Sequence, residues 1–259
     1  MKLTKHVGIA MLALSILSCS SDDGETISGF GNLIVEFDNS YSDSDLLLNT
    51  TIYSAVETEK IKISAVKYIV SNIKLEDEEG NIYEVPKNDS YFIIDESSES
   101  SQLIDLSDVP AGNYTKITYG IGVDQEKYLQ GAEGQGYFLT HAQEAGMMWA
   151  WQAGYKFFVY EGVYTSNNTT TETAFAYHMG SHGTSLDNYK EITLNLPSTA
   201  RVRSDLSPIL HVVADLSNIL DGTTQFMLDD AAQIHVDAIK SPQIATNASG
   251  MFMVHHVHN

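Results

Sequence analysis

The chain has 259 residues and is strongly acidic, since 34 Asp and Glu against 14 Lys and Arg give a formal net charge of −20. A surface of this charge repels the phosphates of DNA and RNA, so we exclude nucleic acid as a partner. With 43% hydrophobic residues, the chain can bury a substantial core. Its composition changes only at an early Ser/Asp stretch, which indicates one folded domain over residues 29–259.

Residues 1–18 are typical of an export signal. Lys2 and Lys5 precede an apolar run of 11 residues, 7–17. That length suits a signal peptide and falls short of the roughly 20 residues that a membrane-spanning helix needs. We therefore expect the mature chain to begin after residue 18.

The end of this segment, Ile16-Leu17-Ser18-Cys19, resembles a lipobox, in which a small residue precedes the cut and the cysteine thiol receives the lipid. Cys19 is the only cysteine of the chain and so cannot form an internal disulfide. The alternative is a free thiol beside an ordinary signal-peptidase site. The polar residues 19–28 are typical of a tether. We predict a lipoprotein of the bacterial cell envelope, held in the bilayer through acylated Cys19, with the outer membrane as the expected location.

Short stretches of alternating apolar residues recur along the chain and predict strands. They lie at 33–37, 66–75, 82–85, 91–94, 117–123, 156–164, 192–196 and 210–216. Helical patterns are few: one turn at 216–220, and a short helix in which Ile244, Ala248 and Met251 share a face. We therefore predict an all-β fold, an antiparallel β-sandwich or barrel with one or two short helices.

Histidines are the main candidates for metal ligands. His178 and His182 are four residues apart, and His255, His256 and His258 lie within the last five residues. Imidazoles without thiolates suit copper, zinc, iron or nickel, and the methionines in the same segments favour Cu(I). For the methionines, core packing is the simpler interpretation.

Other histidines stand singly. For His211 and His235, each in a strand-like segment, we expect partly buried residues with satisfied hydrogen bonds rather than ligands. The segment 146–157 contains both tryptophans, Trp149 and Trp151, which would share a face on a strand. Its composition alone favours an aromatic core.

The run 38–45 superficially resembles a calcium loop. It lacks the glycine at the sixth position, and Asn49 stands where a bidentate glutamate is needed. We interpret it as a polar loop, with weak calcium binding as the alternative. Sequence motifs of nucleotide-binding loops, serine hydrolases and zinc proteases are absent from the chain.

Several segments, in order along residues 29–259, resemble those of the MbnP-like family of copper-binding proteins, which occur near methanobactin systems and as lipoproteins in Bacteroidetes. They are Lys67-Tyr68-Ile69-Val70-Ser71-Asn72-Ile73-Lys74-Leu75, Val109-Pro110-Ala111-Gly112-Asn113-Tyr114, Gly120-Ile121-Gly122-Val123-Asp124, the run from Gly146-Met147-Met148-Trp149-Ala150-Trp151 to Glu161-Gly162, His178-Met179-Gly180, and the closing Met251-Phe252-Met253-Val254-His255-His256-Val257-His258-Asn259.

The resemblance implies a β-rich domain that binds copper, as Cu(I) or Cu(II), through two histidines. In some relatives a tryptophan oxidised to kynurenine completes the site, and a haem peroxidase partner makes the kynurenine. On this basis Trp149 or Trp151 is the modifiable residue, and His178 with His256 or His258 supplies the ligands. The best-known secreted relatives place a histidine two residues after the kynurenine, where this chain has Trp151.

We predict a binding protein for copper acquisition or buffering and not an enzyme. Two alternatives remain open. A surface lipoprotein could bind glycan or protein on an aromatic platform formed by Trp149 and Trp151. A metal-dependent enzyme would need an open coordination position beside an acid/base residue such as Glu161.

Replacing the lipid-bearing cysteine tests the predicted anchor. Cys19→Ala should leave the protein unacylated, because the thiol is the attachment point. The variant should be absent from the membrane pellet after detergent-free fractionation, whereas wild type should be retained. Retention of both proteins would contradict the lipobox.

Overall fold

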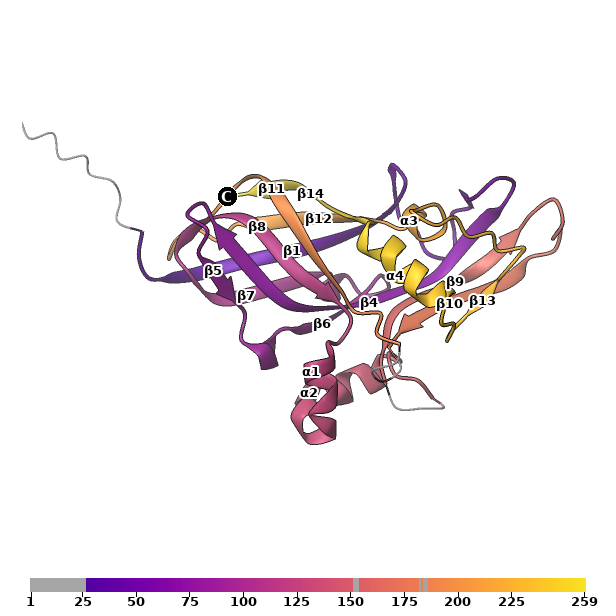
Figure 1. The fold of residues 1–259 in the computed structure, drawn as a ribbon. Helices are drawn as coiled ribbons and strands as arrows, with labels where there is room; N and C mark the ends of the chain where they lie inside the picture. Colours follow the sequence, from indigo (N-terminus) through magenta and orange to yellow (C-terminus); the bar gives the residue numbers. More distant parts are fainter. Residues whose placement is uncertain (1–26, 151–153, 182, 184–185) are drawn as a thin grey trace, which may run out of the picture.

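Two β-sheets pack face to face in the computed structural model, which describes residues 27–150, 154–181, 183 and 186–259 (Figure 1). The five-stranded sheet consists of β1 (Phe30–Tyr41), β2 (Ser44–Asp45), β7 (Leu103–Pro110), β12 (Ile209–Asp215) and β14 (Phe252–His258). The nine-stranded sheet consists of β3 (Tyr53–Ser54), β4 (Lys60–Asp77), β5 (Ile82–Glu84), β6 (Tyr91–Asp95), β8 (Gly112–Ile121), β9 (Lys156–Thr165), β10 (Thr173–Gly180), β11 (Lys190–Val202) and β13 (Gln233–Ile234). The predicted β-sandwich class is therefore confirmed.

Strand pairing is mixed rather than wholly antiparallel. In the five-stranded sheet the order is β14-β12-β1-β2, and β1 also pairs with β7. The main path of the other sheet is β11-β8-β4-β9-β10-β13. Two pairs, β1 with β12 and β10 with β13, are parallel, and the remaining ladders are antiparallel. The parallel pair β10–β13 joins segments that are far apart in sequence.

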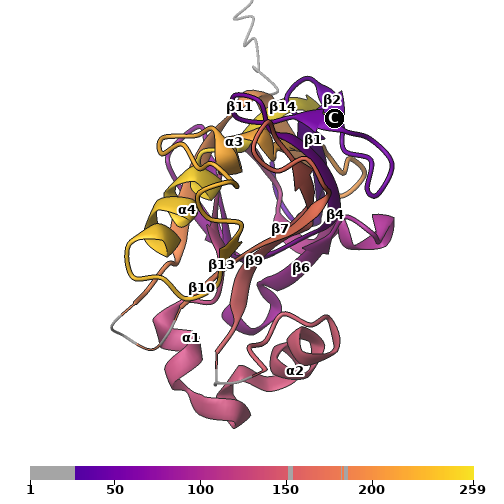
Figure 2. The same cartoon turned by 90° about the vertical axis from the view of Figure 1, so that its right-hand side faces the viewer.

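The helices are short and lie outside the two sheets. They are α1 (Gln125–Leu129), α2 (Gly131–Glu144), α3 (Ser217–Leu220) and α4 (Lys240–Ser249), with 3₁₀ turns at Lys87–Asp89 and Glu99–Ser101. Figures 1 and 2 show α1 and α2 projecting together from one side, away from α3 and α4. Among the described residues, none of the helices is long and apolar enough to cross a membrane.

Helices α3 and α4 confirm the two helical segments predicted near 216–220 and before the C-terminus. Helices α1 and α2 were not predicted. Glycines occupy three positions in α2, and Gly136 has φ 58°, which interrupts the helix. A helix broken in this way carries no continuous apolar stripe, so periodicity does not reveal it.

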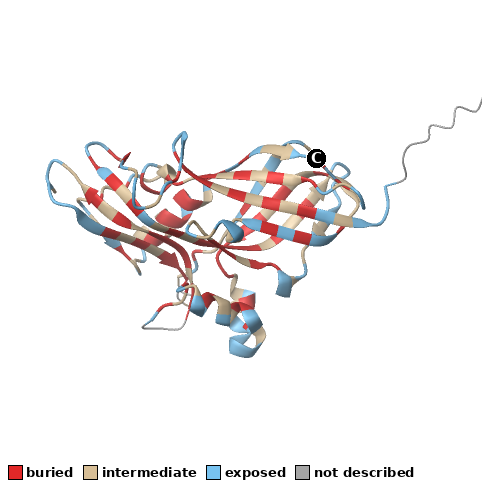
Figure 3. Ribbon diagram, turned by 180° about the vertical axis from the view of Figure 1, so that it is seen from behind, coloured by how far each residue is buried: buried red, intermediate tan, exposed pale blue. Residues whose placement is uncertain are grey.

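Alternation of buried and exposed side chains follows most strands (Figure 3). In β1, Leu33, Val35 and Phe37 are fully buried, while Ile34 and Glu36 between them are half-buried. Successive side chains of a strand point to opposite faces, so one face of each sheet enters the core and the other meets solvent. In β1 this alternation directs the carboxylate of Glu36 to the outer face.

Four aromatic side chains connect the two sheets. Phe37 of β1 and Phe252 of β14 meet Tyr68 of β4 and Tyr119 of β8, with ring centroids 5.6–6.1 Å apart. The contacts are edge-to-face, the geometry that aromatic pairs prefer. The Tyr68 hydroxyl donates to Asn39 Oδ1 at 3.0 Å, so its polar end is satisfied inside the core.

Truncation of the central ring should weaken the sandwich. Phe37→Ala should lower the free energy of unfolding by about 3–5 kcal/mol, because it removes a fully buried ring and leaves a cavity. Phe30→Ala, in the same strand but with the ring 61% exposed, is the matched control and should cost less than about 1 kcal/mol. Urea unfolding measures both, and equal losses would contradict the assigned core.

Candidate metal centre

The outer face of β9 and β10 brings a carboxylate and a histidine together. Glu161 of β9 is paired with Ala176 of β10 in the antiparallel ladder, and His178 is two residues further along β10. Residues in this diagonal relation lie on the same face and are within reach of each other. Accordingly, Glu161 Oε1 lies 2.6 Å from His178 Nε2.

A second histidine, directly after β13, reaches the same place. The parallel ladder pairs Tyr177 with Ile234, so that the residues that follow them, His178 and His235, are neighbours. Their Nδ1 atoms are 3.0 Å apart, and their ring centroids are 4.6 Å apart. Strands β9 and β10 and the residue after β13 thus supply one carboxylate and two imidazoles.

The hydrogen bond to Glu161 determines which nitrogen of His178 is available. An ionised carboxylate can only accept, so Nε2 carries the proton and donates it to Glu161. The lone pair on Nδ1 of His178 then faces Nδ1 of His235. A carboxylate that holds the distal N–H of an imidazole is the usual support of a metal-ligating histidine.

The spacing of the two Nδ1 atoms is close to what a metal requires. Two nitrogens that bind one tetrahedral metal at about 2.0–2.1 Å lie roughly 3.3 Å apart. The observed 3.0 Å therefore needs only a slight separation of the rings. His178 and His235 therefore fit a metal ion bound between their two Nδ1 atoms.

Burial lowers the pKa of His178 below its ordinary value of 6.5, and the neighbouring charge of Lys156 acts in the same direction. The hydrogen bond and charge of Glu161 oppose this shift without cancelling it. The imidazole is therefore neutral at pH 7, the form in which histidine binds metals. Burial also lowers the pKa of Lys156, whose Nζ donates to the Gly146 carbonyl at 3.0 Å.

Trp149 packs against this site. Its side chain is buried, and its ring centroid lies 6.2 Å from that of His178. Gly180 allows this approach, because a Cβ atom there would lie 3.1 Å from Cζ2 of Trp149 and would also collide with the Tyr155 carbonyl. Trp149 also lines a cavity of about 640 Å³ together with Met148, Leu129 and Leu139, among other residues.

The other predicted ligands lie elsewhere. His256 and His258 belong to β14 in the five-stranded sheet, whereas His178 belongs to β10 in the nine-stranded sheet. In Figure 1 the C-terminus and β10 are near opposite ends of the molecule. The predicted single site combining His178 with the C-terminal histidines is therefore not the arrangement observed. Trp151, His182 and Cys19 lie outside the described residues.

Sequence reasoning missed two members of the site. His235 was expected to be a structural residue, yet it contacts His178, and Glu161 was considered only as an acid/base residue. One signal in the sequence could have found them: each lies beside apolar residues of a strand-like stretch, and side chains alternate between the two faces of a strand. His141 lies apart on α2, where its ring stacks on Tyr137.

The calcium-like run 38–45 forms the end of β1 and its turn into β2. Ser40 and Tyr41 pair with Asp45 and Ser44 in an antiparallel hairpin. The Ser42 amide donates to Asp215 Oδ1 at 2.8 Å, which ties the turn to the end of β12. This segment is thus a β-hairpin with its own hydrogen bonds and not the polar loop that the sequence predicted, because residues 38–41 continue β1 and Tyr41 is buried in the core.

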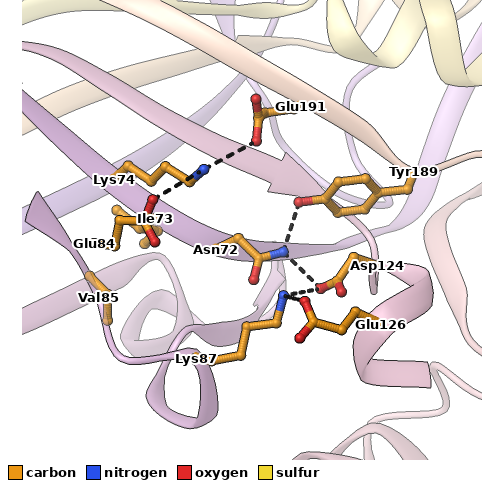
Figure 4. A pocket seen from close by; sticks show the side chains of 10 residues that line it. All are labelled: Asn72, Ile73, Lys74, Glu84, Val85, Lys87, Asp124, Glu126, Tyr189 and Glu191. Carbon is orange, nitrogen blue, oxygen red and sulfur yellow. Dashed lines mark hydrogen bonds and ion pairs between the residues drawn. The ribbon is translucent and has the colours of Figure 1, made fainter. Parts of the chain in front are cut away.

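A polar pocket of about 390 Å³ lies on another part of the nine-stranded sheet (Figure 4). Asn72 donates to both Asp124 and Tyr189 at 2.8 Å, and Lys87 lies 3.0 Å from Asp124. Hydrogen bonds from Tyr91 and Asn72 hold the pKa of Asp124 at about 2 despite its partial burial. The charges of this pocket satisfy one another, and its lining in the described part of the chain contains no histidine.

Residues 30–237 match the protein-family model described as MbnP. The chain therefore belongs to the MbnP family. The matched residues include Trp149, Glu161, His178 and His235 and stop before the C-terminal histidines. A solved structure, MbnP from Methylosinus trichosporium, is similar over 81% of this chain and 82% of that chain, with 12% identity and a TM-score of 0.49. The search of curated proteins gave no match.

Removing the charge of Glu161 should lower the pKa of His178 further, because the carboxylate favours the protonated imidazole. We expect this decrease in Glu161→Gln by NMR titration of the metal-free protein, with His141 as internal control. An unchanged His178 pKa in the variant would contradict the assigned pair.

The lowered pKa of His178 also predicts how stability depends on pH. Because burial holds the pKa of His178 lower in the folded than in the unfolded chain, the unfolded chain takes up the proton first as pH falls. The free energy of unfolding should therefore decrease as pH falls from about 6.5 toward the folded-state pKa.

Proposed function

We propose that this MbnP-family chain is a cell-envelope copper-binding lipoprotein, which serves in copper acquisition or buffering and holds the ion between His178 and His235. The observation that carries the proposal is the facing pair of Nδ1 atoms, 3.0 Å apart, with Glu161 on the far nitrogen of His178. Membership of the family, whose resemblance implies copper, supports the same conclusion.

The donor set fits copper better than harder ions. Neutral imidazoles suit copper, and Cu(II) binds imidazole more tightly than the other divalent first-row metals do. Met179 is fully buried and belongs to the opposite face of β10 from His178, which assigns it to the core and not to the site. Calcium and magnesium prefer oxygen ligands and are not favoured here.

Trp149 is our candidate for oxidation to kynurenine. An intact indole can only donate a hydrogen bond through Nε1 and is not a metal ligand. Kynurenine carries an aromatic amine and a ketone, which provide lone pairs at the edge of the site. The cavity beside Trp149 supports access by an oxidising partner, for which we propose the haem peroxidase suggested by the resemblance.

The alternatives receive less support. A glycan-binding platform needs an exposed aromatic face, whereas Trp149 is only 6% exposed. A metal-dependent enzyme needs a free acid or base, whereas the Glu161 carboxylate is engaged with His178 at 2.6 Å. We therefore assign Glu161 the role of orienting His178 and propose a binding protein without catalytic activity.

Copper titration of the natively expressed protein tests the proposal. Replacing His178 or His235 by Ala should weaken binding at this site by more than about 100-fold, since losing a ligand should exceed the cost of losing an outer partner. Glu161→Gln should weaken it by roughly 10–100-fold. His141→Ala removes an imidazole elsewhere and is the matched control.

Loss of the tight copper in the His178 and His235 variants, but not in His141→Ala, would support the site. Equal affinity and stoichiometry in wild type and in all four variants would overturn it. Intact mass measurement of the same native preparation tests the oxidation of Trp149 separately. An unmodified mass would remove the kynurenine and peroxidase parts while leaving the histidine pair in place.

A further inference from the structure

A second group of histidines lies on the outer face of the five-stranded sheet. The antiparallel ladder pairs His211 of β12 directly with His256 of β14. Their ring centroids are 4.6 Å apart. Directly opposed residues on one face of a sheet are close enough for their side chains to interact.

An irregularity in β14 adds a third imidazole to this face. The register shifts between His211/His256 and Val212/Val254, so His255 is an extra residue without a partner in the ladder. In a regular strand, His255 and His256 would point to opposite faces. A β-bulge places two consecutive residues opposite one and allows both to point the same way. Val254, before the bulge, remains buried in the core.

The three histidines are close enough to share one ion. One ring nitrogen from each of His211, His255 and His256 lies within 4.8 Å of the others. The Nδ1 atoms of His255 and His256 are 2.8 Å apart. His258, whose ring centroid lies 4.6 Å from that of His256, is a fourth imidazole at the edge of the group.

His211 is oriented in the same manner as His178. Its Nε2 lies 3.2 Å from Asp38 Oδ2, on the neighbouring strand β1. Its Nδ1 is buried and has no hydrogen-bond partner within the described part of the chain. A buried polar atom without a partner is unfavourable unless something else satisfies it, and a metal ion would do so.

We propose that His211, His255 and His256 form a second metal site, which binds Cu(II) at the protein surface. Three clustered imidazoles favour Cu(II) over the other divalent first-row ions, because affinity in nitrogen sites rises to copper and then falls at zinc. The carboxylates of Asp38 and Glu36 on β1 add negative charge beside the group and attract cations. The site goes beyond the proposed function and does not depend on it, since it lies on the other sheet and two of its three histidines, His255 and His256, lie beyond the residues matched to the family.

Cu(II) titration of the full-length protein tests this site, with stoichiometry read by calorimetry and nitrogen coordination read by electron paramagnetic resonance. The variants are His255→Ala/His256→Ala, His178→Ala/His235→Ala and the combination of all four substitutions. His141→Ala is the control. His255 is exposed and His256 is half-buried, so the first variant should keep the fold, which its melting temperature checks.

We expect two Cu(II) ions in wild type, one in each double variant and none in the combined variant. One ion in wild type that disappears only in His255→Ala/His256→Ala would support the surface site and contradict the proposed function. One ion that disappears only in His178→Ala/His235→Ala would overturn the surface site and leave the proposed function intact. Two ions retained in His255→Ala/His256→Ala would also overturn it.

Asp38→Asn provides an independent measurement. Because Asp38 acts through His211, the substitution should weaken Cu(II) binding at the surface site by roughly 10-fold or more with unchanged stoichiometry. It should also alter the nitrogen signals of the surface copper while leaving those of the other site unchanged. Unchanged affinity and an unchanged spectrum would contradict the assigned orientation of His211.

Discussion

The packing of two sheets through buried aromatic side chains is the constraint on which the rest of the structure depends. Phe37, Tyr68, Tyr119 and Phe252 fill the space between the sheets and require that their strands present them inward. Because side chains alternate along a strand, the residues between them must face outward. Histidines and carboxylates at those positions therefore lie on the outer faces, where an ion can reach them.

The register of the strands then determines which histidine and carboxylate side chains of the outer faces lie next to one another. The parallel pairing of β13 with β10 places His235 beside His178, and the antiparallel pairing of β9 with β10 places Glu161 on the other side. A shift of one residue in either ladder would turn one partner into the core. On the other sheet, the register of β12 and β14 shifts at a β-bulge, and His255 is the extra residue on the outer face.

The two histidine groups share a local design. In each, a carboxylate on the adjacent strand holds Nε2 of one histidine: Glu161 for His178 and Asp38 for His211. In the first group, Nδ1 of His178 therefore faces Nδ1 of His235. In the second group, Nδ1 of His211 has no hydrogen-bond partner in the described part of the chain. The groups differ in surroundings, since the first packs against buried Trp149 and the second includes the exposed His255 and His258. The difference suits one enclosed site and one open to solvent.

The sequence by itself determined the β-rich class, the two later helices, the family and the set of histidines and tryptophans worth considering. These depend on local alternation and on short motifs, which a single segment carries whatever its neighbours are. Only the tertiary structure decided that His178 pairs with His235, 57 residues away, and not with His256 or His258. Likewise, it placed His211 beside His256 and brought Glu161 and Asp38 onto their histidines. The physical reason is that ligand groups form across strands, and the order and register of strands are set by the packing of the whole core rather than by any segment alone.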